Sequence, residues 1–205
     1  MNRAVDLFDR QFRHQIVAGE FVLNPFEQAV LPYLRGDVLD LGCGMGNLAV
    51  AAANQGCRVT ALDGSAVAIE RLGELARAGN LDIMARQADL GRDHGREDIA
   101  ADFDAVVAIG LLMFFPRPRS TAMLASIRDA TRRGGIAAVN VLIEGTTFMD
   151  MFESDHYTLF GRDEVTEVFQ QAAGGWEILL ARHEGFDAPR GTRKEFSTVI
   201  ARKPA

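Results

Sequence analysis

The sequence has few cysteines, no long hydrophobic run and no apolar leader. Its 205 residues include two cysteines, Cys43 and Cys57, which are too few for a disulfide scaffold. Neither lies in a pattern with zinc-ligand spacing, so we expect a reducing compartment and no metal site. No apolar stretch is long enough to span a bilayer, and the N-terminal segment lacks the apolar core of a secretory signal. We therefore expect a cytoplasmic protein with no membrane partner.

Positive charge is also scarce. The 22 Lys and Arg residues stand against 28 Asp and Glu, which gives a formal net charge of -6. Proteins that neutralise a phosphate backbone need clustered Lys and Arg, so we expect no nucleic-acid partner. The cluster Arg190, Arg193 and Lys194 is a small exception, and it is either a solvated turn or a site for an anion. Nothing in the sequence indicates an oligomeric state.

The composition and periodicity are those of an α/β domain. Hydrophobic residues make up 48% and charged residues 24%, a balance typical of globular proteins. From residue 36 onward, strand-like apolar runs alternate with helix-like segments, which predicts βαβ units around a parallel sheet. We expect Phe103–Ile109 to be the central strand, because its apolar residues follow one another without alternation. The predicted parallel strands are Asp37–Leu41, Arg58–Asp63, Asp82–Ala88, Phe103–Ile109 and Ile136–Leu142.

The C-terminal part predicts a hairpin. Helical spacing over 165–172 is followed by two strand-like runs, Trp176–Ala181 and Phe196–Arg202, which the polar stretch His183–Glu195 separates. Strands joined without a helix run antiparallel, so the hairpin should supply one antiparallel strand. The fold class that follows is a doubly wound α/β fold with a seven-stranded mixed sheet.

A helix should begin near the N-terminus, because Asn24-Pro25-Phe26-Glu27 combines a cap residue, a proline at the first helical position and a capping-box glutamate. The length suits one domain with a sizeable core. We expect a single domain over residues 1–205, with an N-terminal helical cap over 1–35 and a Rossmann-like core over 36–205.

A glycine-rich turn, Asp40-Leu41-Gly42-Cys43-Gly44-Met45-Gly46, follows the first strand and opens a helical segment, Asn47 to Gln55. Glycines let the backbone approach a ligand closely, and the helix N-terminus offers unpaired N–H donors to ligand oxygens. Cys43 is interpreted as packing in this turn rather than as a nucleophile. The third glycine comes one residue earlier than in the dinucleotide fingerprint, which argues against a nicotinamide cofactor.

Two carboxylates follow the next strands. Asp63 ends the second strand at the carboxyl edge of the sheet, where ligands of open α/β sheets bind, and it can accept from both ribose hydroxyls. The alternative, a cap for the helix that starts near Ser65, is compatible with that role. Asp89 follows the third strand, and it either accepts from an adenine amino group or is a simple loop aspartate.

These residues resemble the class I S-adenosylmethionine-dependent methyltransferases over nearly the whole chain. Val38 to Asn47 is similar to the first motif of that family, Val59 to Asp63 to its ribose-binding strand end, and Gln87 to Leu90 to its adenine-side motif. The resemblance implies that these segments hold the methionine part, the ribose and the adenine of S-adenosylmethionine. The cofactor-binding residues that it implies are Asp40, Gly42, Cys43, Gly44, Gly46, Asn47, Asp63, Gly64, Ser65, Asp89, Leu90 and Ile109.

A closer resemblance is to the small tellurite-resistance methyltransferases, through Phe103 to Val107, Leu112 to Phe115, and the ending Gly175 to Ile178 and Phe196 to Lys203. Members of that group carry a His-Arg pair in the loop between the last two strands, facing the substrate. The corresponding loop here, Glu184 to Arg193, has arginines but no histidine, which argues against a tellurite or selenite substrate. The residues after the fourth strand also lack the Pro-Pro-Tyr of enzymes that methylate exocyclic amines of adenine or glutamine.

The expected reaction is methyl transfer to a small-molecule acceptor by in-line displacement, in which the enzyme mainly aligns the reactants. A general base matters only if the acceptor must lose a proton. His156 is a candidate base or a surface histidine, and Met113 and Phe114 shape the acceptor pocket or fill the core. The substrate-side residues are Met113, Phe114, Tyr157, Arg190 and Arg193. Two alternatives stay open: a nicotinamide-dependent oxidoreductase and a cofactor-binding module without methyl transfer.

Overall fold

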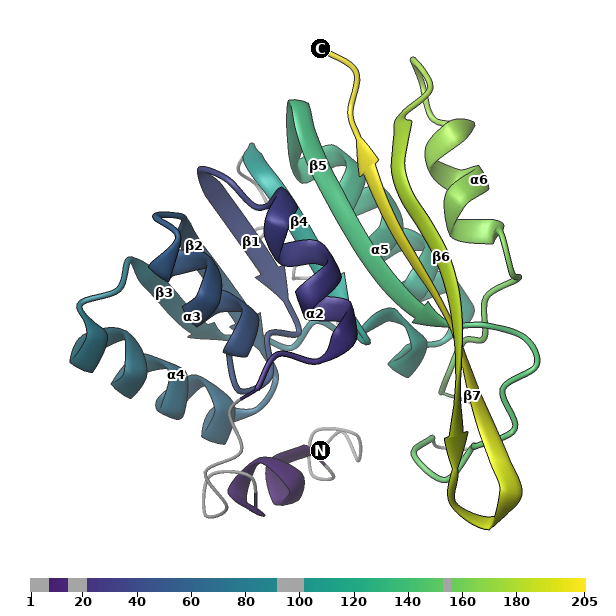
Figure 1. Ribbon diagram of the computed structural model, residues 1–205, viewed down its shortest axis with the longest axis horizontal. Coiled ribbons are helices and arrows are strands. Elements are labelled where there is room, and N and C mark those ends of the chain that lie inside the picture. Colours follow the sequence, from purple (N-terminus) through teal and green to yellow (C-terminus); the bar gives the residue numbers. More distant parts are fainter. Residues whose placement is uncertain (1–7, 15–21, 92–101, 153–155) are drawn as a thin grey trace.

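The fold is built on one seven-stranded sheet. The computed structural model describes residues 8–14, 22–91, 102–152 and 156–205. The strand order is β3-β2-β1-β4-β5-β7-β6, so β4 is the middle strand, as predicted (Figure 1). The strands are β1 (Asp37–Leu41), β2 (Arg58–Asp63), β3 (Ile83–Gln87), β4 (Phe103–Ile109), β5 (Thr131–Leu142), β6 (Glu177–Ala188) and β7 (Thr192–Arg202).

Strand direction confirms the predicted mixed sheet. β1 pairs in parallel with β2 and β4, β2 with β3, and β4 with β5. Only β7 runs against its neighbours, because it pairs antiparallel with both β5 and β6. The C-terminal hairpin thus supplies the single antiparallel strand.

The hairpin is longer than the sequence predicted. The polar stretch His183–Glu195 was expected to separate two short strands, but the β6–β7 ladder continues to the pair Ala188 and Thr192, with a short turn at Pro189–Gly191. The pairing of β5 with β7 ends at Leu142 and Phe196, so the tip of the hairpin extends beyond the rest of the sheet (Figure 1). A ribbon outside the core does not need apolar side chains, which is why its sequence shows no strand pattern.

Helices cover both faces of the sheet. On one face lie α2 (Pro25–Val30), α3 (Asn47–Asn54) and α4 (Ala66–Gly79), and on the other α5 (Arg117–Ala130) and α6 (Glu164–Gln170) (Figure 1). Successive strand residues point to opposite faces, so Val38 packs with the first group of helices and Leu39 with the second. None of the described helices is long and apolar enough to cross a membrane.

The predicted start of α2 is confirmed by its capping box. The side-chain oxygen of Asn24 accepts from the amides of Phe26 and Glu27, both at 2.9 Å, and the carboxylate of Glu27 accepts from the amide of Asn24 at 2.7 Å. The α-helix ends after Val30 and becomes a 3-10 turn, Leu31–Tyr33, since Pro32 has no amide to continue it.

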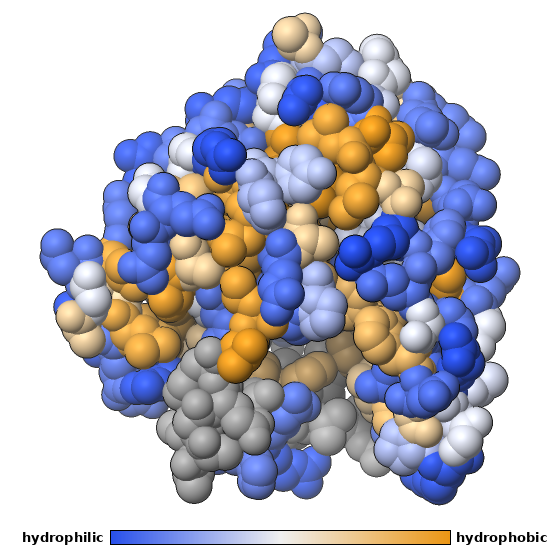
Figure 2. Space-filling view, viewed as in Figure 1, coloured by the Kyte–Doolittle hydropathy of each residue, from blue (hydrophilic) through white to orange (hydrophobic). Residues whose placement is uncertain are grey.

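The N-terminal helical residues 8–14 lie beyond the ends of the strand arrows of β1 and β2, over the carboxyl edge of the sheet (Figure 1). On the face that carries α2, apolar side chains run over the middle of the molecule between polar side chains on either side (Figure 2). Residues 8–14 and α2 therefore both approach the edge where ligands of open α/β sheets bind.

Candidate functional site

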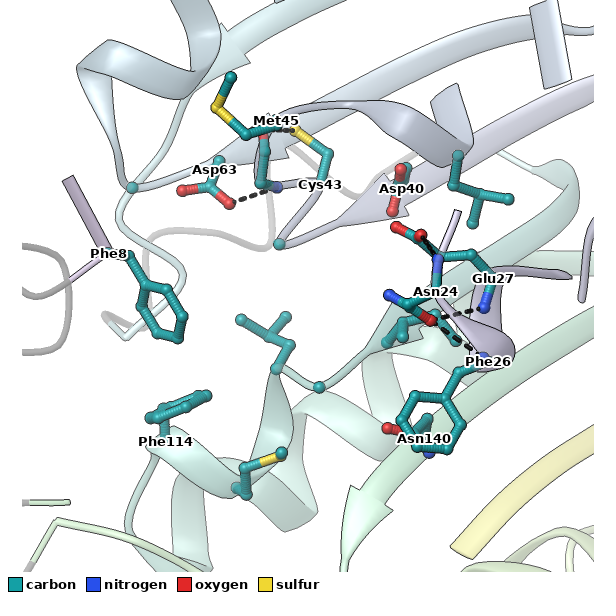
Figure 3. A pocket seen from close by; sticks show the side chains of 18 of the residues that line it. Phe8, Asn24, Phe26, Glu27, Asp40, Cys43, Met45, Asp63, Phe114 and Asn140 are labelled. Atoms are coloured by element: carbon teal, nitrogen blue, oxygen red, sulfur yellow. Dashed lines mark hydrogen bonds between the residues drawn. The ribbon is translucent and has the colours of Figure 1, made fainter. Parts of the chain in front are cut away.

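A cavity of about 490 Å³ lies at the carboxyl edge of the sheet, between the glycine turn, α2 and residues 8–14 (Figure 3). Its size is that of a pocket for a small molecule or cofactor. It is lined by Phe8, Gln11, Phe12, Val22, Asn24, Phe26, Glu27, Asp40, Gly42, Cys43, Gly44, Met45, Asn47, Leu48, Asp63, Gly64, Asp89, Leu90, Gly91, Ile109, Gly110, Leu111, Met113, Phe114, Phe115, Asn140, Met151 and Phe196.

The three glycines of the turn are required by sterics. Gly42, Gly44 and Gly46 have φ values of 72°, 51° and 77°, a left-handed conformation that side chains disfavour. A Cβ on Gly42 would lie 2.9 Å from Leu111, and a Cβ on Gly46 would lie 2.4 Å from Leu72. Gly46 thus faces the packing of α4 and is absent from the cavity wall.

The amides of the turn hold the turn itself together. Those of Gly42 and Cys43 donate to the carbonyl of Leu62 at 2.8 and 3.1 Å, and that of Gly46 donates to the carbonyl of Cys43 at 2.9 Å. The amide of Gly44 donates to Asp63 at 2.8 Å. Each of these four amides therefore has a protein acceptor, and the predicted ligand donors at the N-terminus of α3 stay a prediction. The turn contributes close backbone approach.

Asp63, at the end of β2, points toward the glycine turn. One carboxylate oxygen accepts from the amide of Gly44 and the other from the amide of Ser65, both at 2.8 Å. Burial raises the pKa of Asp63, and the two amides act in the opposite direction. A carboxylate oxygen has a second lone pair, so each oxygen can still accept from a ligand hydroxyl. The capping role belongs to Ser65, whose hydroxyl accepts from the amide of Ala68 at 3.1 Å.

Asp40 is a buried acid at the end of β1 with 4% of its surface exposed. Burial, followed by the nearby carboxylates of Glu27 and Asp63, raises its pKa to about 8. In the described chain its Oδ2 has no hydrogen-bond partner, and no described Lys, Arg or His lines the cavity. A buried carboxyl group among carboxylates either stays protonated or pairs with a cation, and no described residue of the cavity wall provides that cation.

Of the predicted cofactor-binding residues, all but Gly46 and Ser65 line the cavity. Asp89 is exposed at its edge, where its carboxylate accepts from the amide of Gly91 at 3.0 Å. Cys43 is buried, and burial raises the pKa of its thiol, which agrees with its interpretation as a packing residue.

The predicted substrate-side residues divide into two groups. Met113 and Phe114 line the cavity, whereas Tyr157, Arg190, Arg193 and His156 are absent from its described wall. The ring of Phe152 lies between Tyr157 and the cavity residue Phe114. Tyr157 stacks on Phe152, and Phe152 packs on Phe114 with ring centroids 5.3 Å apart. Roles for these four residues stay predictions.

Both arginines of this group form ion pairs on or near the hairpin tip. Arg190 pairs with Asp150, and Arg193 pairs with Glu195 at 2.6 Å and with Asp187 at 3.1 Å. Arg190 and Arg193 thus have carboxylate partners outside the cavity.

Sequence reasoning did not assign four polar cavity residues to the site: Gln11, Asn24, Glu27 and Asn140. Glu27 was assigned only to the capping box, although its carboxylate also lies beside that of Asp40 in the cavity wall (Figure 3). Asn140 is the single polar residue in the apolar run of β5 and is fully buried. A lone amide near the carboxyl end of a buried strand is the signal that could have identified it.

Comparisons with known proteins agree with this site. Residues 38–135 match the family model for a methyltransferase domain. TehB of Haemophilus influenzae, a probable S-adenosyl-L-methionine-dependent methyltransferase, is 25% identical over 205 residues, covering 97% of this chain and 66% of TehB. The crystal structure of TehB superposes with a TM-score of 0.72 at 21% identity, covering 92% of this chain and 65% of that one.

Two further relatives extend the comparison. An uncharacterized protein of Mycobacterium tuberculosis is 36% identical over 125 residues, 60% of this chain, and the chain spans only 44% of its length. The DhpI complex with S-adenosylhomocysteine (SAH) has a TM-score of 0.57 at 23% identity, covering 98% of this chain and 97% of DhpI. Residues 38–135 are therefore similar to methyltransferase domains, and the chain is similar to TehB, a probable S-adenosyl-L-methionine-dependent methyltransferase, over most of its length.

Proposed function

We propose that the chain transfers a methyl group from S-adenosylmethionine to a small-molecule acceptor by in-line displacement in the 490 Å³ cavity. The observation that carries the proposal is Asp40, a buried carboxylate in the cavity wall with an oxygen that has no partner in the described chain. A ligand with an ammonium group would satisfy that oxygen and offset the burial of the charge.

The residues of the cavity fit the three parts of this cofactor. Asp40 pairs with the ammonium group of the methionine part, Asp63 accepts from the ribose hydroxyls, and Asp89 accepts from the adenine amino group. Gly42, Cys43, Gly44, Asn47, Gly64, Leu90 and Ile109 form the wall between these carboxylates. When bound, the cofactor supplies a methyl group that is activated by the positive charge on sulfur.

The N-terminal residues form a cap in this proposal, within a single domain over residues 1–205. Phe12 lies over the glycine turn, since a Cβ on Gly44 would lie 3.3 Å from its ring. Phe8 packs edge-on against Phe114 with ring centroids 5.1 Å apart, which joins the cap to the residues after β4. By covering the cavity, these rings exclude water and hold donor and acceptor in line.

A small acceptor suits the shape and charge of the site. The cavity is lined by aromatic rings and carboxylates, and its described wall has no basic residue that would hold a phosphate backbone. The family match gives no support to the nicotinamide-dependent alternative. A module that binds the cofactor without transferring a methyl group is the alternative that needs an experiment.

Isothermal titration with SAH tests the cofactor site directly. We expect one binding site per chain, and folded protein that fails to bind SAH would contradict the proposal. Transfer of a tritiated methyl group from S-adenosylmethionine to a panel of amines, phenols, thiols and oxyanions then separates an enzyme from a binding module. Binding of SAH without transfer to any member of the panel would favour the module.

A further inference from the structure

Asn140 presents an unpaired oxygen to the cavity from a fully buried position. Its relative exposure is 0%, and its side-chain Nδ2 donates to the hydroxyl of Thr198 on β7 at 3.0 Å. Among the described residues, its Oδ1 has no hydrogen-bond partner. Leaving a buried acceptor without a donor is unfavourable, so this atom marks a place where a ligand donates.

The position of Asn140 is fixed on both sides. Its Cα pairs with that of Ile109 on β4, and its carbonyl accepts from the amide of Gly110 at 3.0 Å. On the other side it pairs with Thr198 along β7. In Figure 3, the oxygen of Asn140 is turned toward the cavity, on the side opposite Asp63 and Phe8. The site is thus separate from the carboxylate that holds the ribose in the proposed function.

The surroundings of Asn140 are apolar, and the charged side chains of the cavity wall as a whole are acidic. Phe26 and Phe196 line the same cavity with ring centroids 4.7 Å apart, and they offer a surface to an apolar or aromatic group. The charged side chains on the described wall are Glu27, Asp40, Asp63 and Asp89, all of them carboxylates. This charge repels an anionic acceptor and favours one that becomes positive on methylation.

Building on the proposed function, we propose that the methyl acceptor is an amine with an apolar or aromatic group, whose N–H donates to Oδ1 of Asn140. The neutral amine has lost its proton to water before attack. Its nitrogen forms a bond to the methyl carbon as the carbon–sulfur bond breaks, and the electron pair of that bond goes to sulfur. The product is a methylated ammonium ion, and no base is required.

An amide oxygen suits an amine better than a hydroxyl acceptor. The amine keeps its N–H throughout the reaction, so its hydrogen bond to Asn140 strengthens as positive charge grows on nitrogen. A phenol or alcohol has a single hydrogen and must give it up, and the amide of Asn140 is not a base that can take it. The contact therefore stabilises the transition state for an amine specifically.

The test uses the full chain with tritiated S-adenosylmethionine and three sets of probe acceptors: benzylamine, phenethylamine and aniline; 4-methylphenol; and selenite. We expect transfer to at least one amine and none to selenite. Asn140→Leu should lower kcat/KM for that amine at least tenfold while the Kd for SAH stays within twofold of wild type. Thr198→Val is the matched control, since it removes only the partner of Nδ2, and we expect a loss of about threefold.

Asn140→Asp keeps an accepting oxygen at this position, so we expect it to transfer the methyl group to the amine. This variant tests the role of the oxygen if Asn140→Leu does not fold. The proposal is overturned if protein that binds SAH methylates only the phenol or selenite, or no amine, or if Asn140→Leu transfers at the wild-type rate. Loss of SAH binding in the wild-type protein would contradict the proposed function instead, so the two failures are distinguishable.

Discussion

The two ends of the cavity each contain a buried polar side chain with an unpartnered oxygen, but the two differ in charge. Asp40 on β1 is a carboxylate surrounded by carboxylates, whereas Asn140 on β5 is a neutral amide held by Thr198. A buried carboxylate requires a cation, and a buried amide oxygen requires only a donor. The comparison assigns the charged end to the cofactor and the neutral end to the acceptor.

The largest effect is expected from Asp40→Asn, which removes the charge from the cofactor end and leaves the acceptor end intact. Removing one partner of a buried charge pair costs about 2–5 kcal/mol, so SAH should bind roughly a hundredfold more weakly or worse. Isothermal titration measures this. Asp89→Asn, at the exposed edge of the same cavity, is the control and should change Kd by about tenfold or less. A Kd for Asp40→Asn within threefold of wild type would contradict the assignment.

The pH dependence of binding should also distinguish the two ends. With its pKa raised to about 8, Asp40 is largely protonated at pH 6 in the free protein, and a ligand ammonium requires the carboxylate. SAH affinity should therefore rise by up to about tenfold per pH unit between pH 6 and 8 and then level off. Asp40→Asn should remove this rise, whereas Asn140→Leu should keep it. A flat wild-type profile would show that Asp40 does not titrate on binding.

The stability of the ligand-free protein should fall as pH rises, whereas its affinity for SAH should rise. The pKa of Asp40 is raised from 3.8 to about 8 by folding, so between these values the folded protein binds more protons than the unfolded chain. The contribution of Asp40 is then present at pH 4 and is lost as pH rises through 8. Thermal unfolding of ligand-free protein at pH 5 and pH 9 measures the loss, which should be smaller in Asp40→Asn. An equal change in both proteins would contradict the burial of the charge.

A smaller effect is expected from Asp63→Asn. The amide keeps one accepting oxygen but places N–H groups against the backbone amide of Gly44 or Ser65, so one of the two bonds that hold the turn is lost. With the loss of a charged acceptor for ribose, SAH should bind about tenfold more weakly. The titration is repeated with adenosine, which lacks the ammonium group. If Asp63→Asn weakened the binding of SAH but not that of adenosine, the assignment of Asp63 to the ribose would be wrong.

The smallest effect on SAH affinity is expected from a substitution in the N-terminal cap. Phe12→Ala removes the ring that lies over Gly44 without touching either polar end, and it should weaken SAH binding by about threefold through lost apolar contact. Thermal unfolding checks that the domain stays folded. Unchanged affinity would show that the ring only packs against the turn and does not cover the ligand.

The cofactor end was predictable from the sequence because its residues are local. Asp40 is part of the glycine turn, and Asp63 ends the strand next to it, so a short motif and one strand register bring them together. The occupied amides of the turn were not predictable, since they depend on the carbonyl of Leu62 in the neighbouring strand.

The acceptor end was harder to predict because its contacts join distant segments. Asn140 and Thr198 are 58 residues apart in the chain, and Asn140 lies in no motif. Glu27 was read correctly as a cap, but its nearness to Asp40 depends on how α2 packs on the sheet. Arg190 and Arg193, predicted as a solvated turn or as substrate-side residues, form ion pairs near the tip of the long β6–β7 ladder, and their role stays a prediction.

A crystal structure of the complex with SAH is the most direct test of the account. We predict that the amino group of the ligand lies within hydrogen-bond distance of Oδ2 of Asp40 and that the ribose hydroxyls meet Asp63, with Asn140 left free for an acceptor. A ligand whose amino group is held elsewhere, or whose adenosine occupies the Asn140 end, would contradict the division of the cavity into a charged cofactor end and a neutral acceptor end.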